Sequence, residues 1–267
     1  MDIDSSVYPL VGPIPPHGPK VAPAATIIIF RKGEAPEAPE ILMVQRAREM
    51  RFAGGAAVFP GGRIDASDRA LAQKLAPDAD PEVTAAKIGG IRETLEETGL
   101  VIATGSPVTA KEAVEARAML LEHEDMAPVL DRFGWELDLD SLVFFAHWCP
   151  PRDNAFDTRF FVTDLGTGAV DIEVDATENT RLFWTTAQNA LDMHESGEIS
   201  VIFPTMRNLE RLARFRSFED ACRSAATFPP RRMSAQREII DGEDWVTIPD
   251  GRGYPILGQP LSLARRG

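Results

Sequence analysis

The chain has 267 residues, of which 44% are hydrophobic and 26% are charged, and its formal net charge at pH 7 is −13. It is long enough to bury a core, and its acidic balance argues against nucleic-acid and acidic-membrane partners, because their phosphates require clustered lysines and arginines. The apolar run Ile27–Phe30 is too short to span a bilayer, and Cys149 and Cys222 lack metal-binding or redox spacing. We therefore expect a cytoplasmic protein with free thiols and no membrane partner.

The first part of the chain predicts an arm and a hairpin. Residues 1–24 are rich in proline and aperiodic, so we expect an extended arm, followed by a single domain over residues 25–267. The runs Ala25–Arg31 and Ile41–Arg46 are β-like and are joined by a turn rich in Gly, Pro and Glu. This pattern predicts two antiparallel strands.

A glycine corner and an acidic helix follow. The β-like run Ala56–Phe59 ends in Pro60–Gly61–Gly62, where backbone can approach a ligand closely. Residues 86–98 predict a helix, which Gly99 ends before the strand-like run Leu100–Ile102. Carboxylates at i, i+3 and i+4 share one helix face, and apolar residues share the other; they are Glu93, Glu96 and Glu97, and Ile88, Ile91 and Leu95. A solvated acidic face would fit this pattern alone, but such close like charges also favour a bound Mg²⁺ or Mn²⁺.

In this region the sequence resembles the Nudix hydrolases, whose box reads G-x5-E-x7-R-E-U-x-E-E-x-G-U, with U an aliphatic residue. Gly62 takes the place of the first glycine, and the later positions are matched in order by Arg92, Glu93, Leu95, Glu96, Glu97, Gly99 and Leu100. Asp68 stands at the first glutamate, a position that in the family supports the geometry of the loop and helix. Residues 69–91 number 23 where the box has seven, and we expect residues 69–84 to be largely loop.

The resemblance implies an α/β (α+β) fold in which a mixed β-sheet lies between helices, and a metal-dependent pyrophosphatase activity. It implies metal ligands at Glu93, Glu96 and Glu97, with the backbone carbonyl of Gly61 completing the shell. Arg92 is expected to orient the carboxylates, since its i+4 relation to Glu96 allows contact. Nudix enzymes commonly place a further glutamate before a strand that carries Trp, and Glu178 precedes Trp184. The same acidic loop also offers Asp171, Glu173 and Asp175 as alternatives. Glu93 and Glu178 are therefore the two candidates for the catalytic base.

A second group of residues precedes the glycine corner. Arg46, Arg51, Gly55 and Phe59 follow the spacing R-[SA]-x3-R-x3-G-x3-F-P-G-G, which resembles the coenzyme A diphosphatase branch of the Nudix family. That branch opens with L-L-T-x-R, whereas this chain has Leu-Met-Val-Gln before Arg46. Guanidinium groups could hold the outer phosphates of an anionic substrate, although an ordinary solvated basic loop is the alternative.

The rest of the chain predicts further helices and strands. We expect a helical insertion over about residues 108–135 and C-terminal helices with a tail over residues 187–267. The predicted helices are Ala110–Glu124, Met126–Phe133, Ala187–Glu195, Thr205–Arg214 and Phe218–Ala225, and the predicted strands are Ser141–Trp148, Thr158–Thr163, Arg181–Trp184 and Trp245–Ile248. The layout resembles the larger peroxisomal-type members of the branch, but the chain ends in Ala264–Gly267 rather than in a Ser-Lys-Leu-type address.

Three classes of function are open at this point. The resemblance favours a hydrolase of coenzyme A or acyl-coenzyme A that releases phosphopantetheine and adenosine 3′,5′-bisphosphate, with ADP-ribose, NADH or another nucleoside diphosphate derivative as alternative substrates. The second class is a non-catalytic module that binds such metabolites, and the third is a protein whose acidic helix pairs with a basic partner. The sequence does not specify the oligomeric state, so a homodimer stays open.

Overall fold

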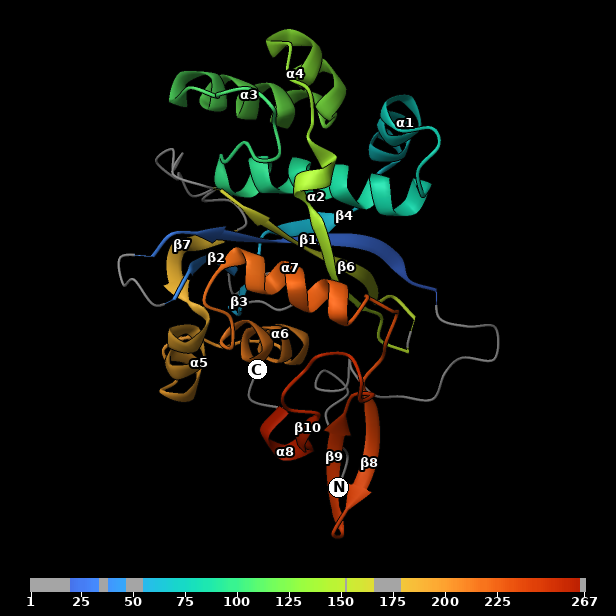
Figure 1. Cartoon of the computed structure of the whole chain (residues 1–267), viewed down its shortest axis with the longest axis vertical. Helices are drawn as coiled ribbons and strands as arrows, with labels where there is room; N and C mark the ends of the chain where they lie inside the picture. The colour runs from blue at the N-terminus through green and yellow to red at the C-terminus, as the bar shows by residue number, and fades with distance from the viewer. Residues whose placement is uncertain (1–19, 34–37, 47–54, 152, 166–178, 265–267) are drawn as a thin grey trace.

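The computed structural model describes residues 20–33, 38–46, 55–151, 153–165 and 179–264 (Figure 1). The strands of its central sheet are β1 (Ala22–Arg31), β2 (Glu40–Arg46), β3 (Ala57–Val58), β4 (Gly61–Arg63), β5 (Val143–Trp148), β6 (Phe156–Asp164) and β7 (Asn179–Thr186). Their order is β3-β2-β1-β6-β5, and β4 pairs with β1 while β7 pairs with β2. The sheet is mixed, because β1 and β6 run parallel and the other pairs run antiparallel.

Helices cover both faces of this sheet. They are α1 (Ala66–Leu75), α2 (Pro81–Thr98), α3 (Ala110–His123), α4 (Met126–Phe133), α5 (Ala187–Glu195), α6 (Phe203–Leu212), α7 (Phe218–Thr227) and α8 (Leu261–Ala264). Helix α2 lies on one face with α1, α3 and α4 beyond it, and α5, α6 and α7 lie on the other face (Figure 1). A small sheet of β8 (Gln236–Ile240), β9 (Glu243–Thr247) and β10 (Gly258–Pro260) extends below them.

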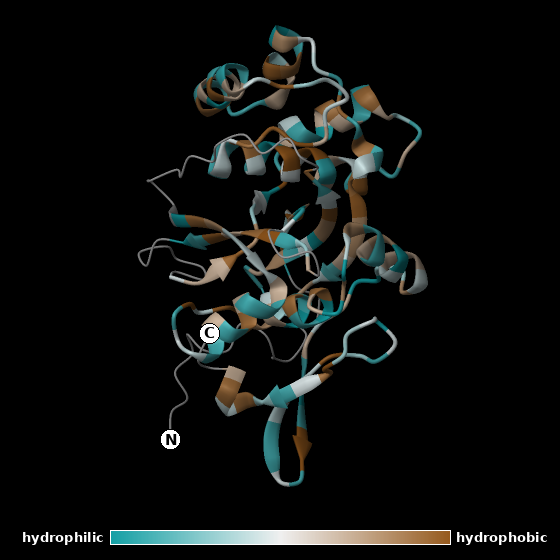
Figure 2. Ribbon diagram, turned by 60° about the vertical axis from the view of Figure 1, so that its left-hand side comes forward, coloured by the Kyte–Doolittle hydropathy of each residue, from teal (hydrophilic) through white to brown (hydrophobic). Residues whose placement is uncertain are grey.

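Strand β1 supplies side chains to both cores. Ile27 and Ile29 pack into the core beneath α2, whereas Ile28 and Phe30 pack into the core beneath α6 and α7. All four are at most 1% exposed, which explains their continuous apolar run, since a strand covered on both faces has no polar side. Figure 2 shows such apolar stretches along the central strands.

The glycine corner docks on one edge of β1. That edge pairs with β4 from Ala24 to Thr26 and with β2 only at Phe30 and Arg31. Between the two pairings, the amide of Ile27 donates a hydrogen bond of 2.9 Å to the carbonyl of Pro60. The chain after Phe59 is thereby fixed at the middle of the sheet, directly beside α2.

Several sequence predictions are confirmed, including the fold class. The first two strands form the expected antiparallel hairpin, and the acidic segment is helical throughout. The expected strands around β5, β6 and β7 and the expected helices α3 to α7 are also present, with most ends shifted by a few residues. No described helix is both long enough and apolar enough to cross a membrane.

The prediction that residues 69–84 are largely loop is wrong. Helix α1 occupies most of the first half of this segment, and α2 begins at Pro81. The proline and aspartates that suggested a loop are in fact start signals: Asp80 caps α2 by accepting hydrogen bonds from the amides of Glu82 and Val83, and Pro81 sits in its first turn. The strand expected at Leu100–Ile102 is also absent; Leu100 is buried in the core beneath α2 without a strand partner.

The β8–β9 hairpin was not predicted, although its signal was present. Its turn contains Asp241 and Gly242, both with positive φ angles of 51° and 83°. An Asp-Gly pair between two strands is a strong hairpin signal.

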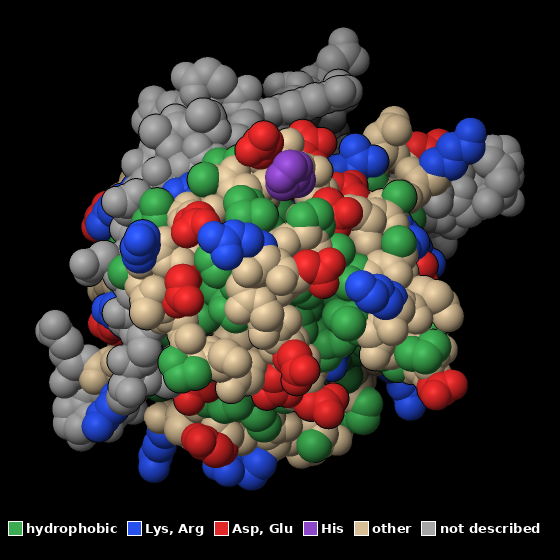
Figure 3. Space-filling model, turned by 90° about the horizontal axis from the view of Figure 1, so that it is seen from above, with side chains coloured by type: hydrophobic (Ala, Val, Ile, Leu, Met, Phe, Trp, Pro, Cys, Tyr) green, Lys and Arg blue, Asp and Glu red, His purple; other side chains and the backbone are tan. Residues whose placement is uncertain are grey.

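At the opposite end of the molecule, seen in Figure 3, charged side chains of both signs are interspersed with scattered apolar ones.

Candidate active site

The glycine corner and helix α2 form the frame of the site. Gly61 has a φ angle of +153°, and a Cβ atom there would lie 2.3 Å from the carbonyl oxygen of Ala25. A Cβ atom on Gly62 would lie 2.3 to 2.5 Å from the Glu93 carboxyl group. Only glycines therefore allow the chain to pass this close to β1 on one side and to the Glu93 carboxylate on the other.

Helix α2 places its acids by local signals. It ends at Gly99 in the left-handed conformation, with a φ angle of +73°. Its buried apolar face packs against β1, and the side chains that make this face are Ile88, Ile91 and Leu95. Glu97, which is only 6% exposed, accepts a hydrogen bond of 3.0 Å from the amide of Gly61. This bond joins the end of the helix to the glycine corner.

Arg92 is the centre of the acidic cluster. Its side chain is 4% exposed, and its guanidinium makes two hydrogen bonds of 3.1 Å to the carboxylate of Asp68. Its Nη1 lies 3.1 Å from carboxylate oxygens of both Glu93 and Glu96. Its Nη2 donates to the carbonyl of Arg63 at 2.8 Å. The guanidinium therefore holds two acids of α2 in fixed positions relative to the loop that contains the glycine corner.

The pKa values of this cluster follow from burial and close charge. Burial would lower the pKa of Arg92, but its hydrogen bonds to Asp68 and the nearby carboxylates outweigh burial and raise it. Burial raises the pKa of Glu93 to about 7, against the opposing charge of Arg92. Burial also raises the pKa of Glu96. The site thus concentrates acidic groups in surroundings that favour a bound positive charge.

The other predicted site residues are placed as follows. Arg46 ends β2, and its buried Nε has no hydrogen-bond partner among the described residues. The amide of Gly55 donates to the carbonyl of Arg46 at 3.2 Å. Phe59 is 2% exposed, and its side chain packs in the core on the α6 face. Arg51 and Glu178 lie outside the described residues.

The donor set suits a hard divalent cation by its chemistry. The carboxylates of Glu93 and Glu97 both border the Gly61–Gly62 corner, and oxygen ligands are those that Mg²⁺ and Mn²⁺ prefer. Within the described part of the chain, however, no three His, Cys, Asp or Glu side chains converge closely enough to hold a metal ion. The contacts explain this, since Glu93 and Glu96 turn toward Arg92 whereas Glu97 turns toward the amide of Gly61.

Two members of the cluster were not predicted from the sequence. Asp65 Oδ2 lies 3.4 Å from Arg92 Nη2, and the amide of Asp65 donates to the carboxylate of Asp68 at 2.8 Å. Asp65 and Asp68 form the capping box of α1, a pattern with acidic residues three positions apart that the sequence does contain. Arg117 of α3 donates to the backbone carbonyl of Glu96 at 2.9 Å, a contact that no local pattern indicates.

Comparisons with known proteins give two informative relatives. No family model matches the chain. The chain is 26% identical over 277 residues to Acyl-coenzyme A diphosphatase NUDT19 of Gallus gallus, which covers 82% of this chain and 71% of that protein. It is also similar to the crystal structure of a NUDIX hydrolase from Alicyclobacillus acidocaldarius, with 29% sequence identity, a TM-score of 0.65, and coverage of 76% of this chain and 96% of that one. Both relatives are named as enzymes, one as a diphosphatase and one as a hydrolase.

Proposed function

We propose that the chain, which is similar to proteins named as a Nudix hydrolase and as an acyl-coenzyme A diphosphatase, cleaves the diphosphate bond of coenzyme A or an acyl-coenzyme A. The products are the phosphopantetheine fragment and adenosine 3′,5′-bisphosphate. The observation that carries this proposal is the cluster in which Glu93 and Glu97 border the Gly61–Gly62 corner while Arg92 pairs with Glu93 and Glu96. The similarity to a diphosphatase named for acyl-coenzyme A supports the substrate class.

In this proposal, Glu93, Glu96 and Glu97, together with the carbonyl of Gly61, hold Mg²⁺ or Mn²⁺, and Glu178 adds a ligand or serves as base. When bound, the cation would neutralise charge on the diphosphate and make a water molecule easier to deprotonate. Arg92 fixes the positions of the Glu93 and Glu96 carboxylates, because its guanidinium is itself held by Asp68.

Water is the nucleophile in the proposed reaction. A carboxylate oxygen of Glu93 or of Glu178 accepts its proton, a bond forms from the water oxygen to one phosphorus, and the bond from that phosphorus to the bridging oxygen breaks. The other phosphate leaves with the bridging oxygen, so no covalent intermediate on the protein is required. Arg46 and Arg51 bind the outer phosphates of the substrate, and Gly55 allows the turn between them and Phe59.

A substrate panel tests the proposal. Coenzyme A, acetyl-coenzyme A, ADP-ribose and NADH are incubated with Mg²⁺ or Mn²⁺, and the products are separated by chromatography. We expect the coenzyme A species to be cleaved fastest. Glu97→Gln should lower their turnover about 100-fold, because it replaces a proposed metal ligand whose carboxylate also accepts a hydrogen bond from the Gly61 amide. Glu122→Gln, which changes an exposed acid of α3, is the matched control and should leave turnover unchanged.

Two results would contradict the assignment. Equal turnover by wild type and Glu97→Gln, with equal Mn²⁺ affinity in calorimetry of the Glu96→Gln/Glu97→Gln double variant, would exclude the acidic cluster as the metal site. Much faster turnover of ADP-ribose or NADH than of any coenzyme A species, with rates unchanged in Arg51→Ala, would exclude the coenzyme A substrate while leaving the hydrolase class intact.

A further inference from the structure

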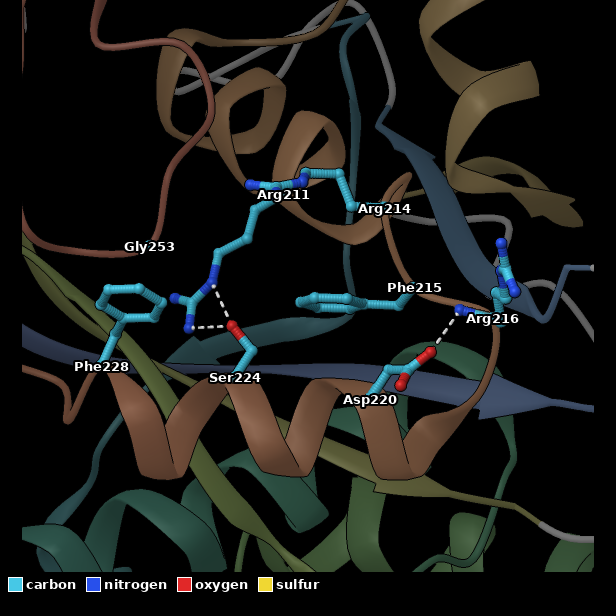
Figure 4. Close-up of a pocket in the computed structure, with 8 residues that line it drawn as sticks. All are labelled: Arg211, Arg214, Phe215, Arg216, Asp220, Ser224, Phe228 and Gly253. Atoms are coloured by element: carbon cyan, nitrogen blue, oxygen red, sulfur yellow. Dashed lines mark hydrogen bonds between the residues drawn. The ribbon is translucent and has the colours of Figure 1, made fainter.

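A cavity lies on the sheet face opposite the acidic cluster. It has a volume of about 460 Å³ and is bounded by the end of α6, by α7 and by the loop at Gly253 (Figure 4). Helix α7 packs on β5 and β6 in the core that contains α6, whereas Arg92 and its acids belong to the α2 face. Its size falls within the range of small-molecule pockets in proteins. The cavity is therefore separate from the proposed reaction site.

Arg211 forms the inner wall of this cavity, and its charge is buried without a carboxylate. It is 1% exposed, and within the described residues its hydrogen bonds go to the hydroxyl of Ser224, at 2.9 and 3.2 Å, to the carbonyl of Phe145, at 3.1 Å, and to the phenolic oxygen of Tyr254, none of which is a carboxylate. Its guanidinium also lies over the rings of Phe145 and Tyr254. A buried charge that no opposite charge compensates is costly, so an anion in the cavity would stabilise this arrangement.

The cavity is positively charged within an acidic chain. Arg211, Arg214 and Arg216 contribute three positive charges and Asp220 one negative charge, a net charge of +2, whereas the whole chain carries −13. Asp220 already accepts a hydrogen bond of 2.8 Å from the amide of Arg216 and contacts Arg223. Arg214 has no ion pair among the described residues. The charge balance thus matches a dianion.

The walls also select the body of the ligand. In Figure 4 the Arg211 side chain runs from α6 toward Ser224, between the rings of Phe215 and Phe228. The loop backbone is close to this wall, because a Cβ atom on Gly253 would lie 2.8 Å from the Phe228 ring and 3.2 Å from Arg211 Nε. Aromatic rings beside guanidinium groups suit a planar ligand body attached to a phosphate.

We propose that this cavity is a second binding site, for a phosphomonoester carried on a small planar body. A phosphomonoester carries close to two negative charges at neutral pH, which balances the net charge of the cavity. Arg214 contacts the phosphate from the open side, and Arg211 adds its charge from behind, whereas Arg216 lies at the other end of the cavity, beyond Phe215 (Figure 4). The ring system of the ligand lies beside Phe215 and Phe228. This site is independent of the proposed hydrolase reaction.

Calorimetric titration of the full chain tests the proposal, with EDTA present so that no divalent cation links the probes to the acidic cluster. The probes are adenosine 5′-monophosphate, inorganic phosphate and adenosine. We expect the monophosphate to bind more tightly than phosphate and adenosine to show no binding. Arg214→Gln should weaken binding of the monophosphate about tenfold, because it removes a charge-assisted hydrogen bond.

Arg231→Gln is the matched control, since Arg231 is also an exposed arginine without an ion pair among the described residues and lies outside the cavity lining. Its affinity for the monophosphate should equal that of wild type. Absence of binding by wild type, equal affinity of wild type and Arg214→Gln, or equal weakening by both substitutions would overturn the proposal. None of these results depends on whether the chain hydrolyses a diphosphate.

Discussion

Two buried arginines, one on each face of the sheet, occupy opposite electrostatic surroundings. The guanidinium of Arg92 is 4% exposed and contacts four carboxylates, those of Asp65, Asp68, Glu93 and Glu96. Arg211 is 1% exposed and contacts a hydroxyl, a carbonyl and two aromatic rings. Burial lowers the pKa of Arg211, whereas the acids overcome burial and raise the pKa of Arg92.

The difference shows what each arginine does for the protein. Arg92 uses its charge inside the chain, where it neutralises acids and sets their positions, so its removal would leave several carboxylates without a cation. Arg211 lines a cavity, and its charge is stabilised by a hydroxyl, a carbonyl and two aromatic rings rather than by a carboxylate. A bound anion would therefore stabilise Arg211 further. Arg207 of α6 is intermediate, because it is buried and, among the described residues, pairs with one carboxylate, that of Glu210, at 2.6 Å.

Substitution of Arg92 should have the largest effect. Arg92→Met leaves the carboxylate of Asp68 buried without its cation, and loss of one partner from a buried ion pair costs about 3 to 5 kcal/mol. We expect a loss of this size in the free energy of unfolding, measured by urea denaturation with an unchanged m-value. Hydrolase activity should fall as well, because Glu93 and Glu96 lose their common partner.

Arg69→Met is the control for this comparison. Arg69 pairs with Glu82 on the same face of the sheet, but its side chain is 37% exposed, so we expect a cost below about 1 kcal/mol. If Arg92→Met cost no more than Arg69→Met, the acids around Arg92 would not be energetically coupled to it.

Substitution of Arg211 should have a smaller effect despite its deeper burial. Arg211→Met removes the charge without leaving a carboxylate unpaired, and the Ser224 hydroxyl can turn to water in the cavity. The carbonyl of Phe145 and the phenolic oxygen of Tyr254 then lose a buried donor, and we expect a cost of about 1 to 2 kcal/mol in urea denaturation. A cost equal to that of Arg92→Met would mean that Arg211 has a structural counter-charge and would remove the reason for an external anion.

The parts of the fold with strong local signals were predictable from the sequence. Helix α2 has an apolar face and a terminal glycine, and these signals predicted a helix over residues 86–98. Its capping residue Asp80 suggested a loop instead, so the first turn of the helix after Asp80 was missed. Helix α1 was missed because its buried face is narrow, with only Asp68, Leu71 and Ala72 buried. One of these is a charged residue, whose burial depends on Arg92 in a later helix, and such a contact has no signature in the local sequence.

The same distinction applies to the candidate site. Spacing along α2 predicted which acids share a face, since that depends only on helical geometry. It could not predict that Arg92 also binds the carbonyl of Arg63, 29 residues away. Nor could it predict the surroundings of Arg211, whose carbonyl partner Phe145 is 66 residues away. The first contact arises when α2 packs on β4, and the second when α6 and α7 pack on β5.

The pair of Arg207 and Glu210, the intermediate case, should make the free energy of unfolding depend on pH. Burial raises the pKa of Glu210 to about 7, and the charge of Arg207 offsets this only in part. In the unfolded chain the carboxyl group has its ordinary, lower pKa. The folded state therefore binds the proton more tightly, and the stability that Glu210 contributes is fully present below the unfolded pKa and is lost as the pH rises through about 7.

Glu210→Gln should remove this pH dependence. We expect the difference in free energy of unfolding, wild type minus Glu210→Gln, to decrease between pH 5 and pH 8, by less than about 1.4 kcal/mol per pH unit, the limit for one proton. Glu195→Gln, an exposed acid at the end of α5, should leave the slope of wild type unchanged. A difference that increased with pH would mean that the charge of Arg207 outweighs burial, and Arg207 would then belong with Arg92 as an internally compensated arginine.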